Sequence, residues 1–173
     1  MLGYASMDIE NARAQDSVGE SIIWVARNNM GTVLVSYTTD TYVDVYDKHL
    51  KGTTHNWKGK HIHKHYPHQG RDWDANTFLK PKLIAEVLKT NDSVLYVDSD
   101  AMIMDERIND IDKVVGNADI ACVFLDNAKW YGNDSSIIEP LTGTLYVTKK
   151  AMPFVNEWIG NCYGEIADGE AFA

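Results

Sequence analysis

The sequence is poor in cysteine and has no long apolar run, and each scarcity excludes a class of protein. Only two of its 173 residues are cysteines, and Cys122 and Cys162 lie far apart in apolar stretches. We expect both to be reduced and buried, because a small disulfide-stabilised domain would be dense in cysteine. No segment approaches the ~20 apolar residues of a membrane span, and residues 1–16 lack the basic-then-apolar order of a signal peptide. The expected compartment is therefore the cytoplasm.

Basic side chains are also scarce. Lys and Arg together number 16 against 25 Asp and Glu, which gives a net charge of −9. Proteins that bind nucleic acid normally carry a basic surface, so a nucleic-acid partner is not expected. An anionic substrate would need a local reversal of the electric field, which a divalent metal ion can supply.

The remaining composition is that of a globular protein with a substantial core. Apolar residues make up 45 % of the chain and charged residues 24 %, without an internal repeat or a low-complexity segment. We interpret residues 1–173 as one domain that begins with a helical segment over 1–31. The apolar patterns predict strands at 32–39, 60–67, 93–100, 119–125 and 143–148, and helices at 17–31, 40–52, 74–91, 107–117 and 151–163. This alternation indicates an α/β fold with a mainly parallel sheet and helices on both faces.

Two aspartates follow the most apolar of these strands, in the segment SVLYVDSDAMIM at 93–104. On an extended chain Asp98 and Asp100 would project from one face, roughly 7 Å apart at Cα. The carboxyl ends of strands are where α/β sheets bind ligands. Two carboxylates facing one point repel each other unless a cation lies between them, and oxygen ligands suit Mg²⁺ or Mn²⁺ bound together with phosphate. The simpler alternative is that Asp98 caps the turn and Asp100 is only solvated.

Three segments together resemble the nucleotide-sugar-dependent glycosyltransferases of the GT-A fold. They are FLKPKLIAEVLKTNDSVLYVDSDAMIM at 78–104, TGTLYVTKKAMPFVNEWI at 142–159 and ADGEAFA at 167–173. The resemblance covers roughly residues 32–173. It implies a Rossmann-like three-layer α/β/α sandwich with a mainly parallel central sheet. It also implies metal-dependent transfer of a sugar from a nucleoside-diphosphate donor, expected to be a UDP sugar, to a glycan or another hydroxyl acceptor.

The same resemblance implies a role for individual residues around the donor. Asp98 and Asp100 would hold Mn²⁺ or Mg²⁺ on the diphosphate, and Ser99 would lie near the ribose. Lys80 would contact the donor phosphate or sugar. Residues at the ends of other strands would bind the nucleoside or the donor sugar: Ser36, Tyr37, Thr38 and Thr39 for the nucleoside, and Asp126, Thr142 and Gly143 for the sugar.

On the acceptor side, Asp168 and Glu170 would take the proton of the attacking hydroxyl if the reaction inverts the sugar. A solvated terminus is the alternative for both. Trp130 and Tyr131 could form a platform for the acceptor sugar, or could simply anchor a loop. Gly169 stands where the family has glutamine, and the usual downstream histidine ligand has no counterpart before Ala173. We therefore expect the C-terminus to be either short or truncated relative to the family.

The sequence also allows other interpretations. His61, His63 and His65 lie at strand spacing and could hold zinc, or could form a polar strand face. Trp57 and Trp158 are expected in the core. The competing functions are a non-catalytic nucleotide-sugar-binding module, a nucleotidyltransferase, and a Mg²⁺-dependent phosphotransferase of the haloacid-dehalogenase type. The last would carry its D-x-D motif on the first strand, whereas here it begins at position 98.

Overall fold

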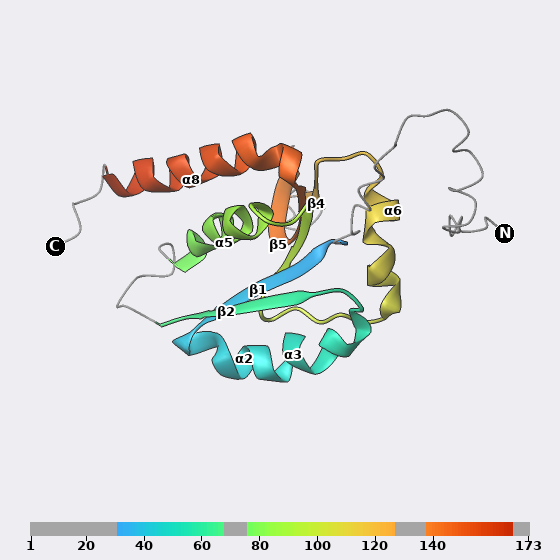
Figure 1. Cartoon of the computed structure of the whole chain (residues 1–173). Coiled ribbons are helices and arrows are strands. Elements are labelled where there is room, and N and C mark those ends of the chain that lie inside the picture. Colours follow the sequence, from blue (N-terminus) through green and yellow to red (C-terminus); the bar gives the residue numbers. More distant parts are fainter. Residues whose placement is uncertain (1–30, 68–75, 127–137, 168–173) are drawn as a thin grey trace, which may run out of the picture.

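The computed structural model of the protein describes residues 31–67, 76–126 and 138–167. Within them lies one five-stranded sheet with the strand order β2-β1-β3-β5-β4 (Figure 1). The strands are β1 (Val33–Thr39), β2 (His61–Tyr66), β3 (Ser93–Val97), β4 (Ile120–Asp126) and β5 (Ile138–Thr148). Strand β1 pairs in parallel with β2 and β3, whereas β5 is antiparallel to both β3 and β4. Four strands therefore run in one direction and only β5 runs against them, which confirms the mainly parallel sheet.

Helices cover both faces of the sheet and complete the predicted three layers. One face carries α5 (Leu79–Leu88) and α8 (Met152–Ala167), which contact each other, and the opposite face carries α2 (Val43–Lys48) and α3 (Leu50–Thr53) (Figure 1). The short helix α6 (Ile111–Val115) packs on the same face of the sheet as α2 and α3. Short 3₁₀ segments join these elements: η1 (Asp40–Tyr42), η2 (Thr54–Asn56), η3 (Glu106–Asp110) and η4 (Lys149–Ala151).

The two apolar cores follow from the two-residue alternation of the strands. In β3, Val94 and Tyr96 join the core beneath α5 and α8, while Leu95 and Val97 join the core on the α3 side. All five residues of β3 are buried. Each such aliphatic side chain contributes about 1.5–3 kcal/mol through burial, so β3 is fixed firmly at the centre of the sheet. The end of β3 at Val97, directly before Asp98, is therefore fixed as well.

The structure differs from the sequence prediction at several elements. The helix expected over 107–117, for example, is the 3₁₀ segment η3 followed by the short helix α6. The helix expected over 40–52 is divided into η1, α2 and α3. Tyr42 separates η1 from α2 at φ −106° and ψ 4°, and His49 separates α2 from α3 at φ −111° and ψ −86°. The loop expected up to Pro140 ends earlier, because β5 begins at Ile138. The helix predicted at 17–31 lies outside the described residues. Within the described ranges, no helix is both long enough and apolar enough to cross a membrane.

Candidate functional site

Asp98 and Asp100 lie on a tight turn at the end of β3. Strand β3 ends at Val97, and the Ala101 N–H donates to the Asp98 carbonyl at 3.1 Å. The expectation that an extended chain would project both carboxylates from one face is therefore wrong, since the hydrogen bond closes a turn over residues 98–101. Both residues nevertheless line the same cavity.

A bulge in β5 brings a second segment against Asp98. Cys122 of β4 pairs with Leu145, but the next residue, Val123, pairs with Leu141, so residues 142–144 have no partner on β4. The bulge carries Gly143 to the turn, where its carbonyl accepts the Asp98 N–H at 2.8 Å. A Cβ atom at Gly143 would lie 3.0 Å from Asp98 Oδ2. The Asp98 carboxylate would have to shift slightly to accommodate a side chain at residue 143, so the close approach favours glycine at this bulge.

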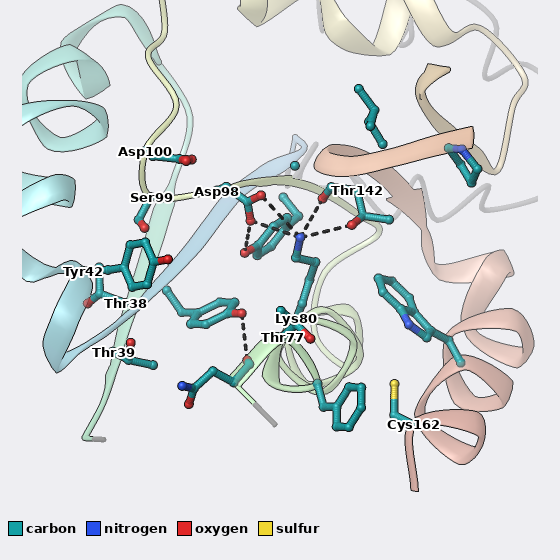
Figure 2. A pocket seen from close by; sticks show the side chains of 18 of the residues that line it. Thr38, Thr39, Tyr42, Thr77, Lys80, Asp98, Ser99, Asp100, Thr142 and Cys162 are labelled. Atoms are coloured by element: carbon teal, nitrogen blue, oxygen red, sulfur yellow. Dashed lines mark hydrogen bonds and ion pairs between the residues drawn. The ribbon is translucent and has the colours of Figure 1, made fainter. Parts of the chain in front are cut away.

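Lys80 of α5 connects Asp98 to the bulge. Its ammonium group lies 3.1 Å from Asp98 Oδ1 and donates to the carbonyl and the hydroxyl of Thr142 at 3.0 and 3.2 Å (Figure 2). The residue is only 7 % exposed, and Nζ lies 4.9 Å from the centre of the Tyr96 ring. An ammonium group has three N–H donors, and the contacts with the Asp98 carboxylate and with the Thr142 carbonyl and hydroxyl account for all of them. Lys80 therefore offers the cavity its positive charge and not an uncommitted donor.

The buried Tyr96 and the partly buried Tyr37 lie beneath this cluster. The Tyr96 hydroxyl donates to Asp98 Oδ1 at 2.8 Å, and the Tyr37 hydroxyl donates to the Asn76 carbonyl at 2.9 Å. Burial and the Asp98 charge raise the pKa of Tyr96 well above its ordinary value, and the same two causes raise the pKa of Tyr37 to about 12. Both phenols therefore stay protonated, and Tyr96 remains a hydrogen-bond donor that orients Asp98.

The cavity has a volume of about 620 Å³ and opens where β1 and β3 end. Its polar lining carries one ammonium, from Lys80, and three carboxylates, from Asp98, Asp100 and Glu139. In Figure 2, Thr38, Thr39 and Tyr42 lie on one side of Lys80 and Cys162 lies on the other. The volume suits a ligand larger than a single sugar.

The structure brings most of the predicted donor-site residues together in this cavity. Those that line it are Tyr37, Thr38, Thr39, Lys80, Asp98, Ser99, Asp100, Thr142 and Gly143. Ser36 does not, since it is fully buried and its hydroxyl contacts His61 and His63. Asp126 ends β4, but its side chain lies outside the described part. The predicted Trp130, Tyr131, Asp168 and Glu170 also lie outside the described residues.

The other residues that line the cavity were not predicted from the sequence as site residues: Tyr42, Asn76, Thr77, Phe78, Tyr96, Glu139, Pro140, Leu141, Trp158 and Cys162. Tyr96 could have been predicted, because it lies two residues before Asp98 and would point to the same face of the strand expected over 93–100. Trp158 was expected in the core and does pack partly against it, but it also lines the cavity. Its helical pattern alone could not separate these two roles.

Among the described residues, no group of three or more His, Cys, Asp and Glu side chains could hold a metal ion. The three histidines of β2 do not converge on a common point, because hydroxyl groups of β1 lie between them. The zinc alternative therefore has no support in this part of the chain. At the D-x-D turn two carboxylates are present, which is the number Mg²⁺ commonly takes from a protein when phosphates and waters complete its shell.

Comparisons with known proteins show that this chain resembles a solved structure in its fold. No protein-family model matches the sequence, and no curated protein does either. The structure is similar to that of a glycosyltransferase involved in the glycosylation of the major capsid of PBCV-1, with a TM-score of 0.52 and 15 % sequence identity over 75 % of this chain. The match spans 66 % of that protein, just under two thirds. A197 from STIV matches with 9 % identity and a TM-score of 0.40 over 71 % of this chain and 68 % of that one, which is too low to support a conclusion. The chain thus has an α/β fold that resembles a glycosyltransferase structure.

Proposed function

We propose that the protein is a metal-dependent glycosyltransferase of the GT-A type. It would bind a nucleoside-diphosphate sugar, with UDP as the expected nucleotide, and transfer the sugar to a glycan or another hydroxyl acceptor. The observation that carries the proposal is the cavity at the D-x-D turn, where two carboxylates, a buried ammonium and aromatic side chains line a space of about 620 Å³. A space of this size fits a nucleotide sugar.

The charges of the cavity support a metal ion as part of the proposal. The three carboxylates outnumber the single ammonium among the described lining residues, so an anionic diphosphate would be repelled. The Asp98 side chain is 38 % exposed, Asp100 is exposed, and both supply oxygen ligands. The residues therefore fit Mn²⁺ or Mg²⁺ held by Asp98 and Asp100 with the diphosphate, and a bound metal would act as a Lewis acid on the leaving phosphate.

The protein's own residues would perform the remaining work. The buried charge of Lys80 would stabilise the negative charge that develops on the leaving diphosphate, a form of preorganised electrostatic catalysis. Tyr96 would hold the Asp98 carboxylate in one orientation through its 2.8 Å hydrogen bond. Asp168 or Glu170 would serve as the base of an inverting reaction, and Trp130 and Tyr131 as the acceptor platform. Glu139 adds a carboxylate on the cavity wall that could also accept the acceptor's proton.

The experiment that tests this proposal is thermal unfolding of the protein with a panel of nucleoside diphosphates and their sugars, in Mn²⁺, in Mg²⁺ and in chelator. A ligand at ~100 times its dissociation constant adds about 2.7 kcal/mol to the free energy of unfolding. For a chain of this size that corresponds to a rise in Tm of roughly 5–10 °C. We expect stabilisation by one nucleotide class only, and only with metal. The variant Asp100→Asn should abolish it, whereas Glu157→Gln, an exposed position on α8 outside the cavity lining, should retain it.

Asp100→Asn is a cleaner test than a change at Asp98, because Asp98 also pairs with Lys80 and Tyr96 within the fold. No stabilisation by any nucleotide would overturn the proposal. Stabilisation without sugar transfer to a broad acceptor panel would favour the binding module instead. Release of pyrophosphate from a nucleoside triphosphate would favour the nucleotidyltransferase, and hydrolysis of a phosphate monoester the phosphotransferase.

A further inference from the structure

The histidines of β2 and the hydroxyl groups of β1 form one continuous hydrogen-bonded chain, which we call the histidine ladder. Its members, in spatial order, are His61, Ser36, His63, Thr38, His65 and Asp40. The Ser36 hydroxyl lies 3.0 Å from His61 Nε2 and 2.8 Å from His63 Nδ1. The Thr38 hydroxyl lies 3.2 Å from His63 Nε2 and 3.3 Å from His65 Nδ1. His65 Nε2 then lies 2.9 Å from Asp40 Oδ1.

The parallel register of β1 and β2 creates this chain. Ser36 pairs with His63 and Thr38 pairs with His65, so each hydroxyl lies between two successive imidazoles on the same face. Ser36 and Thr38 are buried, at 0 % and 2 % exposure, and therefore rely on the ladder for their hydrogen bonds.

When all three histidines are neutral, the ladder has one consistent direction. An ionised carboxylate only accepts, so Asp40 requires a proton on His65 Nε2. His65 Nδ1 is then an acceptor and takes the Thr38 proton. Repeating this step along the ladder places a proton on Nε2 of His63 and on Nε2 of His61. Every donor then points toward Asp40.

When His65 is protonated, the opposite direction is equally complete. His65 then donates from both nitrogens, so Thr38 must accept from it and donate to His63 Nε2. His63 donates from Nδ1 to Ser36, and Ser36 donates to His61 Nε2. No buried hydroxyl loses a partner in either state, so the two directions exchange without breaking the ladder.

We propose that the histidine ladder is a proton wire. A proton from water binds His61 Nδ1, and the proton of His61 Nε2 moves to Ser36, whose own proton moves to His63 Nδ1. The proton of His63 Nε2 then moves to Thr38, whose own proton moves to His65 Nδ1. The net change is one proton taken from solvent and one positive charge placed on His65, beside the Asp40 carboxylate. This inference does not rest on the proposed function.

The surroundings of His63 suit a relay. The Tyr46 ring stacks on the His63 ring with centroids 3.7 Å apart and an interplanar angle of 8°, which fixes both nitrogens in the ladder. Burial lowers the pKa of His63 to about 4, with further lowering by His61 and His65, so its imidazole is neutral near pH 7. The charged groups facing it from α2 and α3, Asp47 and Lys51, act in opposite directions. A neutral imidazole has one donor and one acceptor, as the relay requires.

The end of the ladder lies beside the cavity described above. Asp40 is the first residue of η1, and Thr38, Thr39 and Tyr42 around it line the cavity. A proton delivered to His65 therefore changes the charge next to the part of the cavity that Thr38, Thr39 and Tyr42 line.

The test is NMR of the protein with ¹⁵N-labelled histidine, titrated from pH 8 to pH 5, because imidazole nitrogen shifts distinguish the two tautomers and the cation. We expect His61 and His63 to exchange the Nε2–H tautomer for the Nδ1–H tautomer at the same midpoint at which His65 becomes protonated. Unchanged tautomers on His61 and His63 while His65 titrates would overturn the wire. Protonation of His63 before His65 would also overturn it.

Two variants interrupt the ladder at different places. Thr38→Val should leave His65 titrating while neither His63 nor His61 changes tautomer, and Thr38→Ser should restore the coupling. Ser36→Ala should uncouple His61 alone, which gives an independent test if the valine variant does not fold. His55→Gln is the matched control, because His55 contacts the Gly52 carbonyl outside the ladder. Coupling that survives in Thr38→Val would show that the hydroxyls do not carry the proton.

Discussion

At the scale of single residues, the site depends on how tightly Asp98 is held. Its backbone N–H is bound by Gly143 and its carboxylate is bound by Lys80 and Tyr96, from three different elements. Lys80 is buried while Asp98 is partly exposed, so removal of the carboxylate would leave an ammonium group without its counter-ion inside the protein. Asp98 thus has a structural part as well as its proposed part in metal binding.

Gly143→Ala tests whether this close packing is needed. The new Cβ atom would lie 3.0 Å from Asp98 Oδ2, so the carboxylate must move away and weaken its bonds to Lys80 and Tyr96. We expect the free energy of unfolding to fall by about 1–2 kcal/mol, measured by urea denaturation. Under the proposed function, the metal-dependent affinity for nucleotide should fall at least about tenfold, which corresponds to ~1.4 kcal/mol.

Gly52→Ala is the control, because nothing lies within 4 Å of the position a Cβ would take and the residue belongs to helix α3. Alanine is the better helix former, so this variant should be as stable as the parent or more stable by up to about 1 kcal/mol. Equal behaviour of the two alanine variants would contradict the importance of the Gly143 approach.

The sequence allowed Asp98 and Asp100 to be placed at the carboxyl end of a strand, because four apolar residues before them predict a buried strand that must end there. It could not predict what holds Asp98. The bulge at residues 142–144 arises from a change of register between β4 and β5, which is a relation between strands distant in sequence. Two of the three hydrogen-bonding contacts of the Lys80 ammonium group are made to Thr142 in that bulge. Local sequence patterns therefore could not predict them either.

At the scale of secondary-structure elements, β2 adds a pH-dependent contribution to stability. Burial lowers the folded-state pKa of His61, and lowers that of His63 to about 4 from an ordinary value of 6.5. The unfolded chain therefore binds more protons than the folded one between about pH 6.5 and pH 4, and stability falls as the pH is lowered through this range.

We expect the parent protein to lose about 1–2 kcal/mol more than His63→Gln between pH 7 and pH 4.5. The figure is smaller than the full pKa shift implies, because the His63 ring is only half-buried and screened by water. Urea denaturation at a series of pH values measures the difference. Parallel curves for the two proteins would mean that His63 titrates alike in the folded and unfolded states.

Most elements of the fold could be predicted because their patterns are local. The strands β1 and β3 were predicted within one to three residues, since each is a run of apolar and β-branched residues bounded by polar ones. The helix over 40–52 was predicted as continuous because its polar residues do not mark the break at His49. The start of β5 was missed because Pro140 favours a loop, whereas pairing with Phe124 of β4 decides the outcome.

At the scale of the whole molecule, the net charge of −9 opposes the binding of any anionic ligand. The described cavity lining has the same sign, with three carboxylates against one ammonium. Near pH 7 a nucleoside diphosphate without metal would therefore be repelled, while a divalent cation would be attracted. Salt screens both interactions, with a Debye length of about 10 Å at 0.1 M.

The two ligands should therefore respond to salt in opposite ways. Raising NaCl from 20 to 300 mM should strengthen the metal-free binding of UDP by about 2- to 5-fold and weaken the binding of Mn²⁺ alone by a similar factor, whereas uncharged uridine should change little. Isothermal titration calorimetry with each ligand measures these affinities, and uridine serves as the control for effects of salt on the protein itself. If salt instead weakens the binding of UDP, the ligand meets a positive field. The cations responsible would then have to lie outside the described ranges, and the case for a metal that reverses the charge of the site would lose its electrostatic basis.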